Sequence, residues 1–94
     1  MTRENQFKER LIKYMEIEAM SRYEEPVVNE LKKELANEGF EFSRDNFGCL
    51  IMHKPSKNPN APKVLLAAHM DEVGYVVRNF DKKGQLYLST VGGI

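Results

Sequence analysis

The sequence predicts a mixed α/β chain, α+β within these 94 residues, in which two helices precede about five strands. The hydrophobic period carries most of this expectation, because it changes from a helical repeat to alternation after Phe40. A continuous apolar run at residues 64–68 adds a buried type of strand. A composition of 41% hydrophobic and 30% charged residues is typical of a folded, soluble chain.

Two amphipathic helices are expected at the N-terminus. The first spans residues 5–20, where apolar side chains recur every three or four positions. Ser21 and Glu24 then match the capping-box pattern that begins a helix. The second helix is expected to end before Gly39, which suits a C-terminal cap. Each helix has an apolar stripe that needs a partner surface.

The rest of the chain is predicted to form strands and loops. The expected strands span residues 40–42, 49–52, 64–68, 73–80 and 85–90. Residues 81–84 predict a hairpin turn, and the three prolines between residues 54 and 62 predict an exposed loop. The strand at residues 64–68 has the pattern of a central strand covered on both faces. Too few residues follow it to provide that cover, which indicates a fragment of a larger domain.

Charge and composition argue against several classes of function. Lysine plus arginine and aspartate plus glutamate each number 14, so no net charge attracts nucleic acid or an anionic membrane. No apolar run approaches the roughly 20 residues that span a bilayer, and the N-terminus lacks a signal peptide pattern. The single cysteine, Cys49, excludes an internal disulfide and is expected to be buried. We therefore expect a cytoplasmic location, with no nucleic acid or membrane partner.

A His-Met-Asp-Glu-Val-Gly motif at residues 69–74 follows the apolar run directly. A histidine at a strand end can enter a cleft as a metal ligand, and a carboxylate two residues on can orient it. His69 is therefore a candidate metal ligand and Asp71 its candidate orienting carboxylate. Alternatively, His69 is structural and the acidic pair is a polar turn between strands. One histidine beside an acidic pair does not complete a metal site, because zinc sites use three or four protein ligands.

Four segments of the chain carry a resemblance to a known family. These segments are Ser21–Val27, Asp45–Gly48, Val64–Gly74 and Lys83–Gly93. With them the chain resembles the N-terminal part of the glutamyl and deblocking aminopeptidases, cytosolic co-catalytic metallopeptidases also called tetrahedral aminopeptidases. Arg22 departs from this pattern, because it stands where the family usually has glycine after the serine.

This resemblance implies the start of a zinc-exopeptidase catalytic domain. In such enzymes two divalent ions, zinc or cobalt, activate a water that removes the N-terminal residue of a peptide substrate. His69 would be a ligand of one ion, and Asp71 the carboxylate of the catalytic centre that orients the site. The general base and the remaining ligands lie farther along the family's chain and have no counterpart here. The family's inserted domain, which drives assembly, begins near residue 94.

Residues 1–94 are expected to be a single domain or a fragment of one. Two hypotheses for their function follow from these observations. In the first, the chain is a segment of a metal-dependent aminopeptidase, is inactive alone, and holds no metal tightly. In the second, it is a non-catalytic remnant or a self-association module. We expect a homo-oligomer under either hypothesis, because exposed strand edges and helix faces can pair between copies.

Overall fold

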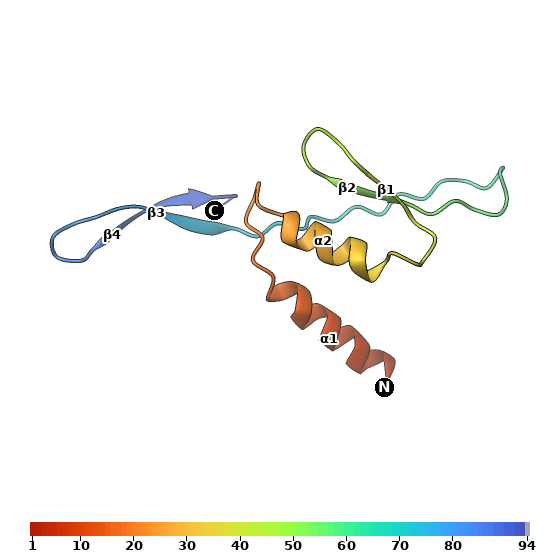
Figure 1. Ribbon diagram of the computed structural model, residues 1–94, viewed down its shortest axis with the longest axis horizontal. Coiled ribbons are helices and arrows are strands. Elements are labelled where there is room, and N and C mark those ends of the chain that lie inside the picture. Colours follow the sequence, from red (N-terminus) through yellow and green to blue (C-terminus); the bar gives the residue numbers. More distant parts are fainter. Residues whose placement is uncertain (94) are drawn as a thin grey trace.

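The computed structural model describes residues 1–93, which form two helices and two separate two-stranded antiparallel sheets. The elements are α1 (Arg3–Met15), α2 (Glu25–Glu34), β1 (Glu41–Arg44), β2 (Leu50–His53), β3 (Gly74–Phe80) and β4 (Leu86–Val91). Figure 1 shows the β3–β4 hairpin projecting to the left of α2, with the β1–β2 hairpin above α2 in this view. The arrangement is α+β, as predicted. Within the described residues, no helix is long and apolar enough to cross a membrane.

Helix α1 is shorter than predicted. It begins at Arg3, where the Thr2 hydroxyl accepts a hydrogen bond from the backbone N–H of Asn5 at 3.2 Å. It ends at Met15 instead of residue 20. The chain that follows leaves the helix and runs alongside residues 71 and 72. Tertiary pairing therefore overrides the helical pattern at residues 16–20.

The capping box predicted at the start of α2 is wrong. Glu24 is the residue that precedes the helix, and its own carboxylate accepts from the backbone N–H of Arg22 at 2.6 Å. Ser21 does not cap the helix, because its hydroxyl donates to Asp71. Pro26 lies in the first turn of α2, where its missing N–H costs no helical hydrogen bond.

The helices are joined mainly by polar contacts around Glu34. Its carboxylate accepts from the Tyr14 hydroxyl, from Arg10 at 2.6 Å and from Lys13 at 3.0 Å. These contacts, the tyrosine first, lower the pKa of Glu34 to about 2. Among the described residues, the buried hydrophobic side chains are Ala19, Val27 and Val28, and α1 contributes none of them.

The hairpin predicted around residues 81–84 is present as β3 and β4, and β1 and β2 form a second hairpin. Strands β1 and β2 pair from Glu41 opposite His53 to Arg44 opposite Leu50. The turn between β3 and β4 contains Gly84 at a φ of +82°, a conformation that glycine adopts without strain. Cys49 corrects a second expectation, because it is exposed in the loop before β2.

The predicted central strand at residues 64–68 is not formed. This segment belongs to no strand, so the described residues contain four strands and not five. Val64, Leu65 and Leu66 are 83%, 88% and 90% exposed. A strand requires a hydrogen-bonded neighbour, and none of the described backbone hydrogen bonds joins this segment to either hairpin. Residues 64–68 therefore have the composition of a buried strand but form an exposed, unpaired segment.

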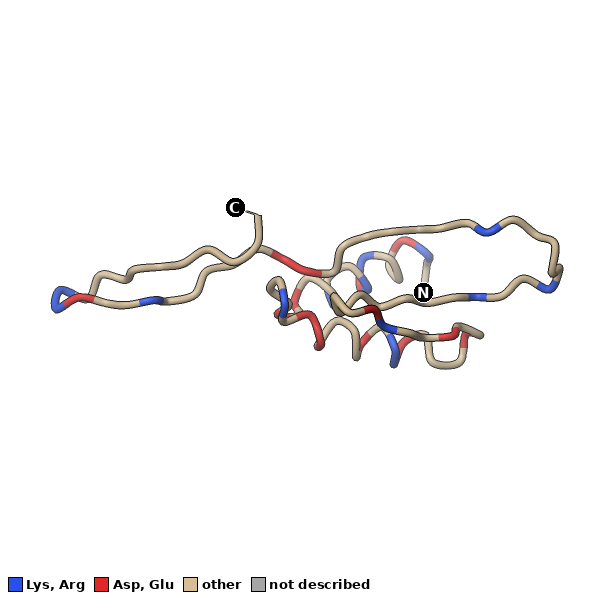
Figure 2. Tube along the Cα trace, turned by 90° about the horizontal axis from the view of Figure 1, so that it is seen from above, with Lys and Arg blue, Asp and Glu red and all other residues tan. Residues whose placement is uncertain are grey.

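The molecule is elongated. Its radius of gyration is 18.3 Å, whereas a compact domain of this length has about 12 Å. Its accessible surface is 8683 Å², roughly 3,000 Å² more than the about 5,600 Å² of a compact monomer of this mass. Figure 2 shows acidic and basic residues interleaved along the helices, and an uncharged stretch leading from the long loop towards β3. Exposed large hydrophobic side chains, among them Val64, Leu65 and Leu66, make part of this excess surface apolar.

Candidate functional site

The candidate site forms where residues 19–22 meet residues 71–74. The backbone N–H of Glu72 donates to the Ala19 carbonyl at 2.8 Å, and the Glu72 carboxylate accepts from the N–H of Ala19 at 3.4 Å. Met20 and Glu72 form a parallel β-bridge. We call this pairing of residues 19–22 with residues 71–74 the clamp. It brings together two segments about fifty residues apart in the sequence.

The clamp places Asp71 between Ser21 and His69. The Ser21 hydroxyl donates to one carboxylate oxygen of Asp71 (Oδ2) at 2.5 Å. His69 Nδ1 lies 3.2 Å from the other oxygen (Oδ1) and 3.0 Å from the Asp71 backbone carbonyl. The bond from Ser21, and then the contact with His69, lower the pKa of Asp71. Asp71 is therefore held as a carboxylate with both oxygens engaged.

These contacts fix which nitrogen of His69 remains free. Both groups facing Nδ1 are oxygen acceptors, so Nδ1 must carry the proton that it donates to them. In the neutral imidazole, Nε2 then keeps its lone pair. The His69 side chain is 87% exposed, so this nitrogen is open to a ligand. A carboxylate behind a histidine is the usual way in which proteins orient an imidazole towards a metal.

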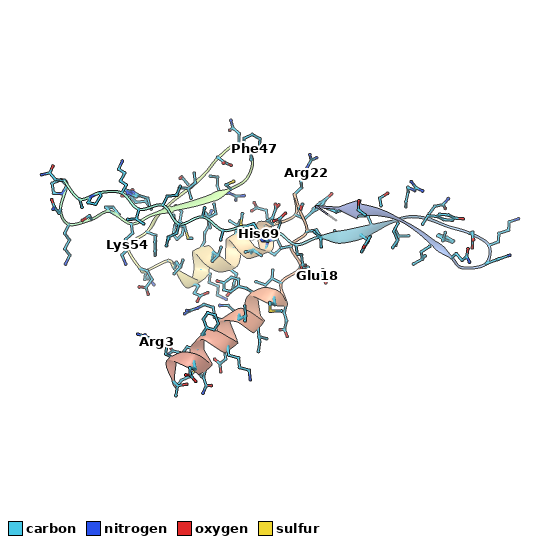
Figure 3. The ribbon with its side chains drawn as sticks, turned by 180° about the vertical axis from the view of Figure 1, so that it is seen from behind. Arg3, Glu18, Arg22, Phe47, Lys54 and His69 are labelled. Carbon is cyan, nitrogen blue, oxygen red and sulfur yellow. The ribbon has the colours of Figure 1, made fainter. Side chains whose placement is uncertain are left out.

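An apolar hollow of about 700 Å³ lies beside this group. Its polar lining comes from the motif itself, namely His69, Asp71 and Glu72, together with Tyr14 of α1. Figure 3 shows His69 and Arg22 near the junction where β3 meets the helical part. A largely apolar hollow with a few convergent polar groups is the usual form of a ligand site. The apolar lining comes from Leu11, Met15, Ile17, Ala19, Val27, Leu31, Leu50, Met52, Leu66, Ala68 and Met70.

The described residues do not form a complete metal site. Residues 1–93 contain no group of three or more histidine, cysteine, aspartate or glutamate side chains that could hold a metal ion. A zinc site needs three or four protein ligands. For a metal ion, the described residues therefore provide one open imidazole nitrogen, on His69, and the Asp71 carboxylate that holds this imidazole.

The structure brings His69 and Asp71 together, as predicted, and adds Ser21. Sequence reasoning missed the partnership of Ser21 with Asp71, because hydrogen bonds across fifty residues leave no local pattern. The second histidine, His53, lies elsewhere, in β2, where it faces the exposed Glu41 at 3.5 Å. His53 therefore takes no part in the candidate site.

Comparison with known proteins identifies the class. The sequence profile of the M42 glutamyl aminopeptidase family matches residues 48–94, which include the motif at residues 69–74. Glutamyl aminopeptidase of Lactococcus lactis subsp. cremoris (strain MG1363) is 38% identical over 78 residues, covering 83% of this chain and 22% of that protein. Lysyl aminopeptidase of Pyrococcus furiosus is 34% identical over 83 residues, covering 87% of this chain and 23% of that protein.

These matches place the chain among the peptidase families. It belongs to the M42 glutamyl aminopeptidase family. It spans less than a quarter of the length of these curated relatives. The matched region covers both the clamp's second segment and the β3–β4 hairpin. The resemblance found in the sequence alone is confirmed.

Proposed function

We propose that residues 1–94 form the N-terminal part of the catalytic domain of a metal-dependent aminopeptidase with a zinc-exopeptidase fold. The relatives' names as aminopeptidases and the His69–Asp71 pair support this proposal. The observation that carries it is the free Nε2 of His69 beside an apolar hollow, with Nδ1 held by Asp71. The peptide substrate, a cytoplasmic location and the absence of nucleic acid or membrane partners belong to the same proposal.

His69 contributes one metal ligand, and Asp71 fixes its orientation and tautomer. Two divalent ions, zinc or cobalt, would supply an activated water and stabilise the developing oxyanion when bound. The remaining ligands and the general base come from sequence beyond these residues, where the family's inserted domain also begins. The 94-residue chain is therefore inactive by itself and holds no metal tightly, since one protein ligand cannot retain an ion.

A chimera tests the proposal. Residues 1–94 replace the matching segment of the Lactococcus glutamyl aminopeptidase, and hydrolysis of an aminoacyl chromogenic substrate is measured. We expect activity in the chimera and none in its His69→Ala variant. Asp71→Asn should weaken metal affinity about 10- to 100-fold, because it keeps the shape of the side chain but loses its charge.

His53→Ala is the matched control for the chimera. His53 is exposed and lies outside the candidate site, so its loss should leave turnover unchanged. A soluble, folded chimera without activity would contradict the proposal, as would full activity in His69→Ala. The isolated 94-residue chain should show no turnover above a metal-free control.

Self-association is the second candidate function. Val64–Leu66 are almost fully exposed, and the chain has roughly 3,000 Å² of surface beyond that of a compact monomer. A standard interface takes about 800 Å² from each partner, so this excess could supply more than one such contact. An unpaired apolar segment is also a template for pairing with a second copy.

Light scattering over a dilution series tests self-association. Leu65→Lys places a charge in the exposed run and should raise the dissociation constant at least about tenfold, since burying an unpaired charge is costly. Phe47→Lys is the matched control, because Phe47 is 92% exposed in the β1–β2 turn, outside the run. A monomeric wild type at all concentrations, or equal effects of the two variants, would contradict this function.

A further inference from the structure

We infer that Ser21 is a positioning residue that fixes the Asp71 carboxylate, and through it the tautomer of His69. This inference rests on the proposed function for its catalytic meaning, because it assigns His69 as a ligand. Its geometry stands independently of any metal. The hydroxyl of Ser21 donates to Asp71 Oδ2 at 2.5 Å, and His69 Nδ1 faces the opposite oxygen at 3.2 Å.

The hydrogen bond from Ser21 restricts rotation of the Asp71 carboxylate. A carboxylate at this position can turn about its terminal torsion, which has a broad energy profile. With Oδ2 held by Ser21, Oδ1 is directed to His69. Short bonds from a hydroxyl to a carboxylate are among the stronger hydrogen bonds in proteins. Removal of the hydroxyl would free the carboxylate to leave the imidazole.

A tight turn presents Ser21 to Asp71. The N–H of Tyr23 donates to the Met20 carbonyl at 2.8 Å, which closes a four-residue turn with Ser21 and Arg22 at its centre. Arg22 has a φ of +75°, as the third residue of a type II turn requires. Glycine or asparagine normally occupies that position, so Arg22 is held there against its own preference. The clamp and the turn together fix Ser21 on the Asp71 side.

Two glycines leave room for this arrangement. A Cβ on Gly92 would lie 3.1 Å from the Ser21 hydroxyl, and the φ of Gly92 is +89°. A Cβ on Gly74 would lie 2.2 Å from the Met20 sulfur and 2.8 Å from its Cγ. A side chain at position 74 would therefore displace the Met20 side chain, and one at position 92 would crowd the Ser21 hydroxyl. The clamp therefore has room because glycine stands at the start of β3 and directly after β4.

The tautomer of His69 in the metal-free 94-residue chain is the direct readout. Long-range ¹H–¹⁵N NMR, recorded at about pH 8, distinguishes the Nδ1–H from the Nε2–H form of an imidazole. We expect the wild type to show mainly the Nδ1–H form. Ser21→Ala should give a mixture in which the Nε2–H form rises at least about threefold. Ser21→Thr keeps the hydroxyl and should restore the wild-type pattern.

Ser43→Ala is the matched control, because Ser43 is an exposed serine on β1 outside the clamp. It should leave the His69 signals unchanged. Backbone amide shifts of α1 and of the β1–β2 hairpin report whether Ser21→Ala keeps the fold. An unchanged tautomer in Ser21→Ala, an Nε2–H form in the wild type, or general unfolding of Ser21→Ala would each overturn the inference. The tautomer is read in the metal-free 94-residue chain, so an inactive chimera would refute the proposed function without changing this result.

Discussion

The chain on the two sides of His69 differs sharply in its contacts. Before His69, Val64–Leu66 are almost fully exposed and belong to no strand. After it, residues 71 and 72 are held by three hydrogen bonds to residues 19 and 21. The polar contacts that orient the histidine are thus made within the described chain. Within the described residues, the apolar segment before His69 has no such contacts.

The largest expected effect comes from breaking the clamp with Gly74→Ala. The new Cβ would overlap the Met20 side chain, and overpacking of this kind costs about 1–3 kcal/mol. Urea unfolding should show this loss, and it should be relieved when Met20→Ala is added. Gly93→Ala is the matched control, since a Cβ there meets nothing within 4 Å. Equal stability of the Gly74 and Gly93 variants would show that the clamp is loose.

Acid should weaken the contact between α1 and α2, which depends on the Glu34 carboxylate. The pKa of Glu34 is about 2 in the folded chain and about 4.5 in the unfolded chain, so its contribution is present above pH 4.5. It is lost progressively as the pH falls from 4.5 to 2. Because Arg10 and Lys13 are partly exposed, solvent screening limits this contribution to about 1 kcal/mol.

Urea unfolding at several pH values measures this effect, with Glu34→Gln as the comparison. The variant should lose most of the dependence between pH 4.5 and 2, while Glu16→Gln should keep it. Glu16 follows α1 and has no hydrogen-bonded contact with α2 among those described. The account of the helix contact is wrong if the Glu34 variant retains the full acid dependence.

The smallest effect is expected from Arg22→Gly. Relief of a left-handed conformation in a non-glycine residue gains about 1–2 kcal/mol, whereas the greater freedom of glycine in the unfolded chain costs about 0.5–1 kcal/mol. The net result should be a stabilisation of about 0.5 kcal/mol. Thermal unfolding of the wild type and of Arg22→Gly measures the sign of the stability change, with Arg78→Gly in β3 as a destabilising control. A loss of stability would mean that the arginine side chain makes a contact that outweighs its strain.

The parts of the fold predicted correctly from sequence have local causes. The β3–β4 hairpin follows from a turn around Gly84, and α2 follows from its apolar stripe and Pro26. The errors arise where distant residues decide. Ser21 fits a capping box locally, but Asp71 competes for its hydroxyl. Residues 64–68 have the composition of a central strand, yet a strand also needs neighbours.

For the candidate site too, only the residues that lie close together in the sequence were predicted. The motif at residues 69–74 identified His69 and Asp71, since both lie in one short segment. Their close approach, with Nδ1 of His69 3.2 Å from Oδ1 of Asp71, agrees with that prediction. Their roles in metal binding stay predictions. Ser21 could not be connected to them, because the turn at Arg22 and the bridge to Glu72 are tertiary features.

Amide hydrogen exchange of the 94-residue chain most directly tests the contrast between the two sides of His69. It is measured by NMR at a dilution where light scattering gives a monomer. The N–H groups of Glu72 and Tyr23 are bonded and should exchange at least about tenfold more slowly than unstructured amides. Those of residues 64–68 should exchange at the unstructured rate. Protection at residues 64–68 in the monomer, with free exchange at Glu72, would contradict the account.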